Sequence, residues 1–370
     1  MNFKDSSIIF FTLVIIATII YYFIYYDLEI SCENQHCKIE LHLHLDSAYS
    51  PEKGLQLIQK YEPNNTIVTV DDLKKNLTFS SYREFISKWV WMSKFIRSPE
   101  DYYDITMDAL KTLSTQGLLY VELTYNFIDV ETTKVVLKAM SNSNDLYGIQ
   151  SNLLINFPRS RKNETELIID LENLKLNEND NNKSSRICGI NLSGKESKNS
   201  SFYYKNLFKY AKNNGLNTTV HTGEDGEVQE IWDSIHNLNP DRIGHGVKAY
   251  QDKSLMEYLK AKQMPMESCV TSNIKTETIS PPIANHPIKL YLDSGIKVFF
   301  NSDDPLYFGN YIDDEMKVLM KTFGFTNANI ERMFKNALES SFLKEDEKKA
   351  IESKCNSICN SKKTIFRFLK

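Results

Sequence analysis

The stretch ELHLHLD, residues 40–46, places His42 and His44 at alternate positions of an otherwise apolar run. Alternate residues of a β-strand point to the same face, so both imidazoles are expected on one side of one strand. Three further polar motifs follow later apolar runs: HTGE (221–224), GHG (244–246) and NSDDP (301–305). Histidine and carboxylate side chains are ligands of catalytic zinc, so the four fragments together predict a zinc hydrolase site.

Eight short apolar runs alternate with longer helical or mixed segments. They cover residues 37–45, 118–125, 149–157, 186–193, 217–223, 241–246, 264–272 and 296–304. Such runs are typical of parallel strands that are buried on both faces and joined by helical crossovers. Eight of these units predict an α/β fold, a (β/α)8 TIM-type barrel.

The candidate ligands share one position relative to these strands. Each lies at the end of its apolar run: His42, His44, His221, His245 and Asp303. In a (β/α)8 barrel the active site is built at the carboxyl ends of the strands, so these side chains are expected at one barrel mouth. Residues 46–117 form the longest interval between two strands and are predicted to hold extra helices that cover this mouth. Phe85 and Trp89 in this interval either face the substrate or pack in the core.

Composition and missing motifs narrow the class of protein. The chain has 370 residues, of which 41% are hydrophobic, and a formal net charge of −4. A packed core is expected, and there is no basic excess that would favour nucleic acid as a partner. No GxGxxG or GxxxxGK[ST] motif offers a phosphate cradle, and no PCxxC follows an HxE as in cytidine-deaminase zinc sites.

Residues 7–26 form an uncharged, mostly apolar run of the length that a membrane-spanning helix needs. A cleaved signal peptide is the alternative, but its apolar region is usually shorter and ends at small residues. The sequence therefore predicts a single-pass membrane protein, with residues 1–29 as tail and anchor and residues 30–370 as the catalytic domain. The charges that flank the span favour a luminal or extracellular catalytic domain.

The six cysteines are scattered and do not form the pattern of a disulfide framework. A bridge between Cys32 and Cys37 is conceivable and would require an oxidising compartment.

Seven fragments, in order, resemble the adenosine deaminase family of metal-dependent amidohydrolases: ELHLHLD, YVEL, GINLSGKE, HTGE, DRIGHG, ESCVTSN and HPIKLYLDSGIKVFFNSDDPLYF. The resemblance runs from about Lys38 to about Glu347. It implies one zinc ion per chain in the barrel mouth and hydrolytic removal of the 6-amino group of a purine nucleoside. Adenosine and deoxyadenosine would then yield inosine or deoxyinosine and ammonia, as in purine salvage.

The metal and the proton transfer are assigned to separate residues. The expected zinc ligands are three imidazoles and one carboxylate: His42, His44, His221 and Asp303. A catalytic zinc keeps one position for water and acidifies it. Glu224, three residues after His221, is the expected donor of a proton to the purine N1. His245 is expected to orient the attacking oxygen, and Asp303 to accept a hydrogen bond from it.

The remaining assignments concern the substrate. Asp304 is expected at the purine N7, and His44 also borders the substrate. By resemblance, Gly194 lets its backbone approach the purine N3 and Asp46 holds a ribose hydroxyl. Lys195, Ser47 and Thr124 depart from residues common in the family and bear on substrate preference. By contrast, His36, His236 and His286 lie outside the strand ends and are read as ordinary core or surface histidines.

Two groups of alternatives remain. One is an adenine deaminase or a deaminase of N6-substituted purine nucleotides. Gly244, where adenine-specific relatives tend to have an acid, favours the nucleoside. The other is a membrane-tethered binding or signalling protein that has lost turnover, against which the complete set of ligands, acid and orienting histidine argues. The sequence does not determine the oligomeric state.

Overall fold

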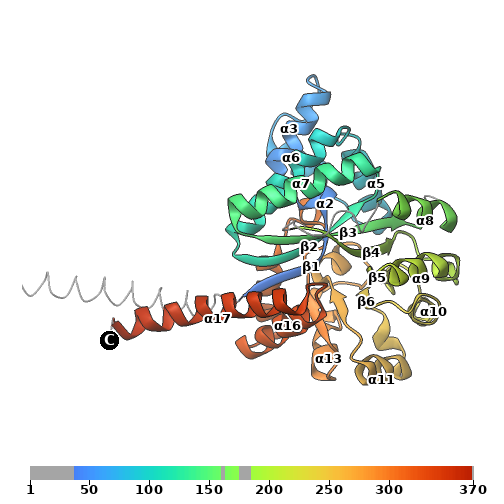
Figure 1. Cartoon of the computed structure of the whole chain (residues 1–370), viewed down its shortest axis with the longest axis vertical. Coiled ribbons are helices and arrows are strands. Elements are labelled where there is room, and N and C mark those ends of the chain that lie inside the picture. Colours follow the sequence, from blue (N-terminus) through green and yellow to red (C-terminus); the bar gives the residue numbers. More distant parts are fainter. Residues whose placement is uncertain (1–36, 160–162, 175–184, 369–370) are drawn as a thin grey trace, which may run out of the picture. The chain divides into compact units, whose positions relative to one another are not determined.

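Eight parallel strands, hydrogen-bonded in the order β1 to β8, form the centre of the protein (Figure 1). The structure is a computed structural model that describes residues 37–159, 163–174 and 185–368. The strands are β1 (Lys38–His44), β2 (Leu118–Asn126), β3 (Gln150–Pro158), β4 (Ile187–Ser193), β5 (Asn217–Thr222), β6 (Arg242–His245), β7 (Met266–Ser268) and β8 (Val298–Phe300). Every residue of β1 and β2 is buried, as expected for strands covered on both faces.

Helices connect the strands and extend the loops. Those that precede β5 are α2 (Leu45–Ala48), α3 (Pro51–Tyr61), α4 (Val70–Asn76), α5 (Tyr82–Ser93), α6 (Pro99–Thr115), α7 (Val130–Tyr147), α8 (Glu164–Asn173), η2 (Ser200–Tyr204) and α9 (Lys205–Asn213). Those that follow β5 are α10 (Val228–Leu238), η3 (Ala249–Gln251), α11 (Lys253–Lys262), α12 (Val270–Lys275), η4 (Ile283–Asn285), α13 (Ile288–Asp293), α14 (Pro305–Phe308), α15 (Ile312–Phe323), α16 (Asn327–Ser340) and α17 (Glu345–Phe368).

The last strand returns to the first and nearly closes the barrel. Leu43 in β1 forms an isolated parallel bridge with Asp303, just beyond β8. The backbone N–H groups of Leu41 and His42 donate to Asn301 Oδ1 at 2.9 and 3.1 Å. These bonds satisfy polar backbone groups where β8 meets β1. The bridge and the bonds to Asn301 together hold Asp303 beside the strand that carries His42 and His44. The predicted (β/α)8 barrel is therefore confirmed.

Two predicted strands are shorter than expected. The run 264–272 contains β7 over three residues only, and α12 begins at Val270. Here Asn273 N donates to Cys269 O, so the chain turns into a helix at the barrel mouth instead of extending the sheet. The run 296–304 contains β8 as Val298–Phe300, after which Asn301 N donates to Ser268 O and the ladder ends.

The extra helices predicted after the first strand are present. Helices α2 to α6 fill the interval between β1 and β2, and α3, α5 and α6 lie together at one end of the barrel in Figure 1. Helix α6 begins with a capping box, in which Ser98 Oγ accepts from Asp101 N and Asp101 accepts from Ser98 N. Such a cap satisfies backbone N–H groups that the helix leaves unpaired.

A buried acid in α15 predicts a pH effect on stability. Glu315 is fully buried, and burial raises its pKa to about 8, against 4.5 in an exposed chain. Folded protein therefore retains a proton that unfolded protein releases, and stability falls as the pH rises from about 4.5 to about 8, by up to ~1.4 kcal/mol per pH unit. Glu315→Gln, which stays neutral, is expected to gain in melting temperature over wild type progressively from pH 5 to pH 8. A difference independent of pH would contradict this expectation.

The described chain divides into two units. Residues 38–352 form the barrel unit, and Cys37 belongs with residues 353–368 to the other. A disulfide joins Cys37 to Cys355, with their Cα atoms 5.7 Å apart. The conceivable Cys32–Cys37 pairing is thus wrong, because Cys37 has a partner 318 residues away that local spacing cannot reveal.

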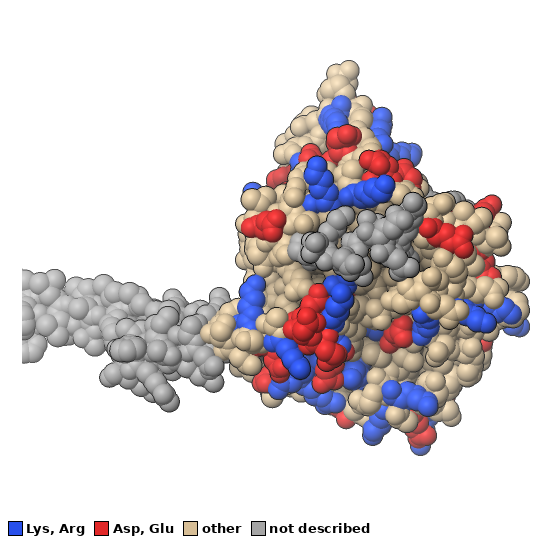
Figure 2. All heavy atoms as spheres, viewed as in Figure 1, with Lys and Arg blue, Asp and Glu red and all other residues tan. Residues whose placement is uncertain are grey.

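The predicted membrane anchor at residues 7–26 and the predicted boundary at residue 29 lie outside the described residues. No helix within residues 37–159, 163–174 or 185–368 is both long and apolar enough to cross a membrane. On the face of the barrel unit in Figure 2, acidic and basic side chains are interspersed, and the described residues form no continuous basic patch there.

Candidate active site

Three imidazoles from two strands converge on one carboxylate at the carboxyl ends of the strands. Asp303 Oδ1 lies 3.4 Å from His42 Nε2 and 3.3 Å from His44 Nε2. His44 Nε2 lies 3.2 Å from His221 Nε2, at the end of β5. All four side chains are buried. The structure therefore brings together the four predicted metal ligands.

The spacing of these atoms fits a metal ion. Two nitrogen or oxygen ligands about 2.0–2.1 Å from a zinc ion in tetrahedral geometry lie about 3.3 Å apart. His42 Nε2 is buried without a hydrogen-bond partner, as expected of an atom that would bind a cation. Burial opposes a charge on His42, but the nearby carboxylates of Asp303 and Glu267 raise its pKa to about 10, so the site stabilises positive charge at this imidazole.

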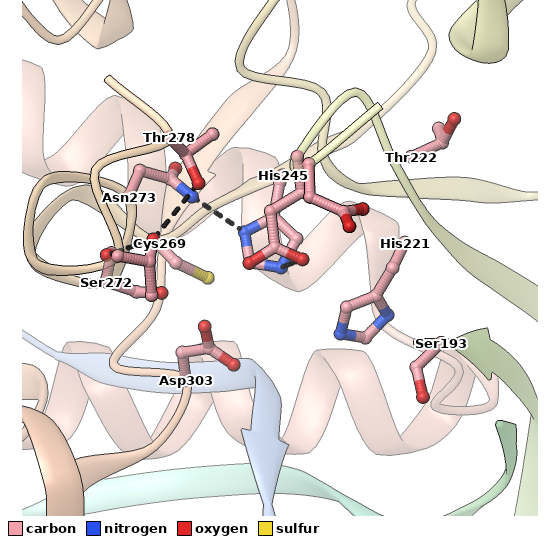
Figure 3. Close-up of polar contacts among 12 residues, drawn as sticks. Ser193, His221, Thr222, His245, Cys269, Ser272, Asn273, Thr278 and Asp303 are labelled. Carbon is pink, nitrogen blue, oxygen red and sulfur yellow. Dashed lines mark hydrogen bonds and ion pairs between the residues drawn. The ribbon is translucent and has the colours of Figure 1, made fainter. Parts of the chain in front are cut away.

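His245 also belongs to the cluster. Its ligand atom and those of His42, His221 and Asp303 lie within 4.8 Å of one another, and His44, Asp303 and Asp304 form a second, overlapping group. Figure 3 shows His221, His245 and Asp303 around a common space. The backbones of His245 (φ 58°) and Asp303 (φ 66°) are left-handed, a conformation that costs about 1–3 kcal/mol and is often found at functional sites.

A buried ionic network supports His42, one of the predicted metal ligands. Glu267 Oε2 contacts His42 Nδ1 at 2.7 Å, so the imidazole donates from Nδ1 and keeps the Nε2 lone pair for a metal. Glu267 Oε1 accepts from Arg242 Nε at 2.5 Å, and Arg242 Nη2 donates to Glu122 at 2.6 Å. Arg242 offsets the charge of both carboxylates, which makes their burial tolerable.

Replacing Glu267 is expected to weaken metal binding. In Glu267→Gln, His42 loses an anionic partner, and loss of such support typically costs 10–100-fold in metal affinity. Competition with a chromophoric chelator measures this affinity. Glu339→Gln, which alters an exposed pair with Lys297, is the control and should bind metal as the wild type does. Equal affinities of Glu267→Gln and the control would show that His42 does not depend on this carboxylate.

An amide ladder leads from His221 to Asp46. His221 Nδ1 lies 3.2 Å from Asn191 Oδ1, and Asn191 Nδ2 donates to Asn156 Oδ1 at 2.8 Å. Asn156 Nδ2 donates to Asn126 Oδ1 at 2.6 Å, and Asn126 Nδ2 donates to Asp46 Oδ2 at 2.6 Å. Burial and the neighbouring imidazoles hold the pKa of His221 well below its usual range. Neutral His221 therefore donates from Nδ1 and keeps Nε2 free for a metal.

Glu224 stands beside this cluster as a carboxylic acid. It is buried, and Oε2 lies 3.6 Å from His245 Nε2. Burial, followed by the charges of Asp303 and Asp225, raises its pKa well above the usual range. A second acid, Glu196, fixes the loop: its carboxylate accepts from the N–H groups of Gly223 and Glu224 at 2.7 and 2.8 Å. The arrangement keeps a proton donor in place at the edge of the site.

Asp304 is also held in a defined position. Ser47 Oγ donates to Asp304 Oδ1 at 2.6 Å. Burial, together with the charge of Asp303, raises the pKa of Asp304 to about 7. A carboxyl group with this pKa can donate as well as accept a hydrogen bond near neutral pH.

A cavity of about 740 Å³ connects these groups, a size typical of small-molecule sites. Its polar walls include predicted site residues, namely His44, Gly194, His221, Glu224, His245, Asp303 and Asp304. Gly194 has φ +83°, a conformation that favours glycine. Phe85 and Trp89 line the cavity too. Phe85 is also buried and packs against Phe79 and Phe308, so its position agrees with both readings.

The supporting residues were not predicted from the sequence: Glu267, Arg242, Glu196 and the ladder asparagines Asn126, Asn156 and Asn191. Each lies within or just after a predicted strand, and a charged or amide side chain at such a buried position is the signal that could have found them. His286 is a buried histidine, 3% exposed and hydrogen-bonded to Asn273, which agrees with its prediction as an ordinary core or surface residue.

A (β/α)8 barrel with converging histidines, a carboxylate and a buried acid at the strand ends defines a metal-dependent hydrolase. Residues 37–358 match the family described as adenosine deaminase, and the chain belongs to that family. Its members are hydrolytic deaminases that act on C–N bonds, and this chain is therefore an enzyme of that kind.

Individual relatives differ in their substrates. The chain is 31% identical over 321 residues to an adenosine deaminase from Clostridium acetobutylicum, which covers 84% of this chain and 94% of that one. It is 28% identical over 325 residues to an adenine deaminase from Crocosphaera subtropica, with 85% and 96% covered. An Arabidopsis N6-mAMP deaminase has a similar fold, with a TM-score of 0.76, 21% identity, and 87% and 98% covered.

Proposed function

We propose that this enzyme uses zinc to convert adenosine and deoxyadenosine into inosine or deoxyinosine and ammonia. The observation that carries the proposal is the buried Glu224, whose pKa is raised by burial and which lies 3.6 Å from His245 beside the His–Asp cluster in a cavity of about 740 Å³. The donor set fits zinc because three imidazoles and one carboxylate leave the ion with net positive charge. When bound, zinc would acidify a water molecule.

The residues divide the remaining work. As the oxygen of water bonds to C6, Glu224 delivers its proton to N1, which keeps negative charge from building on the ring. His245 and Asp303 hold the attacking oxygen by hydrogen bonds. The C6–N6 bond then breaks: the hydroxyl on C6 becomes a carbonyl, its proton passes to the leaving amine, which departs as ammonia, and the other proton of the water restores the acid form of Glu224. Asp304, with a pKa of about 7, donates from its protonated form to N7, which is an acceptor.

Two features support the nucleoside. Asp46, held by Asn126 at 2.6 Å, can accept a hydrogen bond from a ribose hydroxyl, whereas its charge would repel a phosphate. At Gly244 an added Cβ would lie 3.0 Å from His42 Cε1 and 3.3 Å from His221 Cα. Glycine at this position thus leaves room for His42 and His221. It also places no carboxyl group beside the purine, whereas adenine-specific relatives are expected to have an acid here.

One observation favours a second candidate, an N6-substituted purine nucleotide. Arg83 and Lys195 are exposed and line the same cavity, where two cations could attract a 5′-phosphate. The full chain with zinc should therefore be assayed for ammonia release from adenosine, deoxyadenosine, adenine, AMP and N6-methyl-AMP. The nucleosides are expected to show the highest kcat/KM. Preference for a nucleotide, lost in Lys195→Ala, would support the second candidate, and turnover of none would leave an inactive binding protein.

We also propose that residues 7–26 anchor the enzyme in a membrane with its catalytic domain in a lumen or outside the cell. The Cys37–Cys355 disulfide supports an oxidising compartment. The full chain should remain in the membrane fraction after alkaline carbonate washing, whereas a chain without residues 7–26 should not. Release of both would contradict the proposal.

A further inference from the structure

A line of buried side chains runs from the backbone of α13 to the active site. Ile288 N–H donates to His286 Nδ1 at 3.2 Å. His286 Nε2 lies 3.1 Å from Asn273 Oδ1, and Asn273 Nδ2 lies 3.2 Å from His245 Nδ1 (Figure 3 shows the last contact). All three side chains are at most 3% exposed, so water does not compete for these bonds.

The donor and acceptor of every bond in this line follow from the group at its far end, Ile288 N–H. A backbone N–H can only donate, so His286 Nδ1 must accept, and a neutral His286 carries its proton on Nε2. Burial lowers the pKa of His286 to about 3, so this histidine is neutral. It therefore donates to the amide oxygen of Asn273, which turns the amide nitrogen toward His245. His245 Nδ1 then has to accept, and a neutral His245 carries its proton on Nε2.

From this we infer that Asn273 and His286 are positioning residues that hold His245 in the Nε2–H form. His245 then presents an N–H group, with no free lone pair, on the side of the ring that lies 3.6 Å from Glu224 Oε2. Two roles are open to His245, metal ligand or hydrogen-bond donor. The line of hydrogen bonds from Ile288 N–H through His286 and Asn273, which we call the relay, selects the role of donor. The relay also explains why the Nε2 ligands come from His42, His44 and His221, whose Nδ1 partners, where the structure shows them, are the acceptors Glu267 and Asn191.

The effect of this tautomer on catalysis rests on the proposed deamination. The assignment of the Nε2–H tautomer to His245 does not, because it follows from the hydrogen bonds alone. A donor aimed at the attacking oxygen stabilises charge as the oxygen bonds to C6, and it need not reorganise during the reaction. If the bond pattern were reversed, Nε2 would present a lone pair to the same oxygen and repel it. In a serine protease triad, the wrong histidine tautomer costs about 10⁴ in kcat.

Nitrogen NMR of the zinc-loaded full chain, labelled at its seven histidines and assigned by single replacements, reads the tautomer directly. We expect His245 and His286 both to be protonated at Nε2 and unprotonated at Nδ1. A His245 protonated at Nδ1 would overturn the inference, whichever substrate the enzyme takes.

Variants test the relay through activity. Asn273→Asp offers His245 an acceptor in place of a donor and should lower kcat by about 100-fold or more, with zinc content and KM within threefold of wild type. His286→Leu removes the donor to Asn273 and should lower kcat by about tenfold, whereas His286→Gln keeps an amide N–H and should stay within about threefold. His236→Leu is the control, because His236 is exposed and stacks on Trp232.

These outcomes separate the possible failures. A His286→Leu variant with wild-type kcat and an unchanged His245 tautomer overturns the relay. Should that variant not fold, the wild-type NMR result and His286→Gln still decide. If no purine is deaminated, the proposed function fails, and the NMR result alone decides the tautomer.

Discussion

Glu224→Gln is expected to lose turnover by a factor of about 10²–10⁴ while it binds zinc as tightly as the wild type. The amide keeps the size and the loop contacts of Glu224, including the backbone bond to Glu196 at 2.8 Å, but it has no acidic proton for N1. Because Glu224 is not among the side chains that gather around Asp303, metal content should not change. Initial rates with the best substrate of the panel, together with zinc analysis, measure both quantities.

Glu227→Gln provides a matched control for this variant. Glu227 belongs to the same loop, is exposed and caps α10 by a box with Glu230 that an amide can maintain. Its rate should equal that of the wild type. Retained activity in Glu224→Gln would assign the proton to another group, whereas a comparable loss in both variants would point to a disturbed loop.

Removal of the metal is expected to abolish turnover and to lower the melting temperature. Without a cation, the converging groups around Asp303 lose their common partner in a buried site, where unpaired charge is costly. A ligand at 1,000 times its Kd stabilises the folded state by about 4 kcal/mol, so chelation should shift the melting curve clearly. Activity should fall by at least about 100-fold and return upon addition of one zinc ion per chain.

His42→Ala and His236→Ala make this prediction specific. His42→Ala lacks a ligand and should regain neither activity nor stability when zinc is added. His236→Ala should behave as the wild type, since His236 lies on the exposed face of α10. If chelation leaves activity intact while Glu224→Gln abolishes it, the reaction does not require the metal.

The sequence predicted the parts of this protein that depend on local order along the chain. Alternation in ELHLHLD put His42 and His44 on one face of β1, and the end of each apolar run located His221, His245 and Asp303 at the barrel mouth. These predictions succeeded because strand periodicity and parallel topology convert positions in the sequence into positions in space. The substrate assignments of Asp46 and Gly194 came from resemblance. Gly194 and Asp304 line the cavity, whereas Asp46 is held behind it by Asn126, and their roles toward a substrate stay predictions.

Contacts between distant segments were decided by the tertiary structure alone. Glu267 and Arg242, the asparagines that reach Asp46, and His286 behind Asn273 are ordinary residues in the sequence, and Cys37 pairs with Cys355 across 318 positions. Their importance lies in the direction and burial of hydrogen bonds, which depend on side chains from different strands. The sequence thus determined which groups could perform the chemistry. The fold determined which tautomer, charge and partner each group has, because those properties depend on neighbours that only packing supplies.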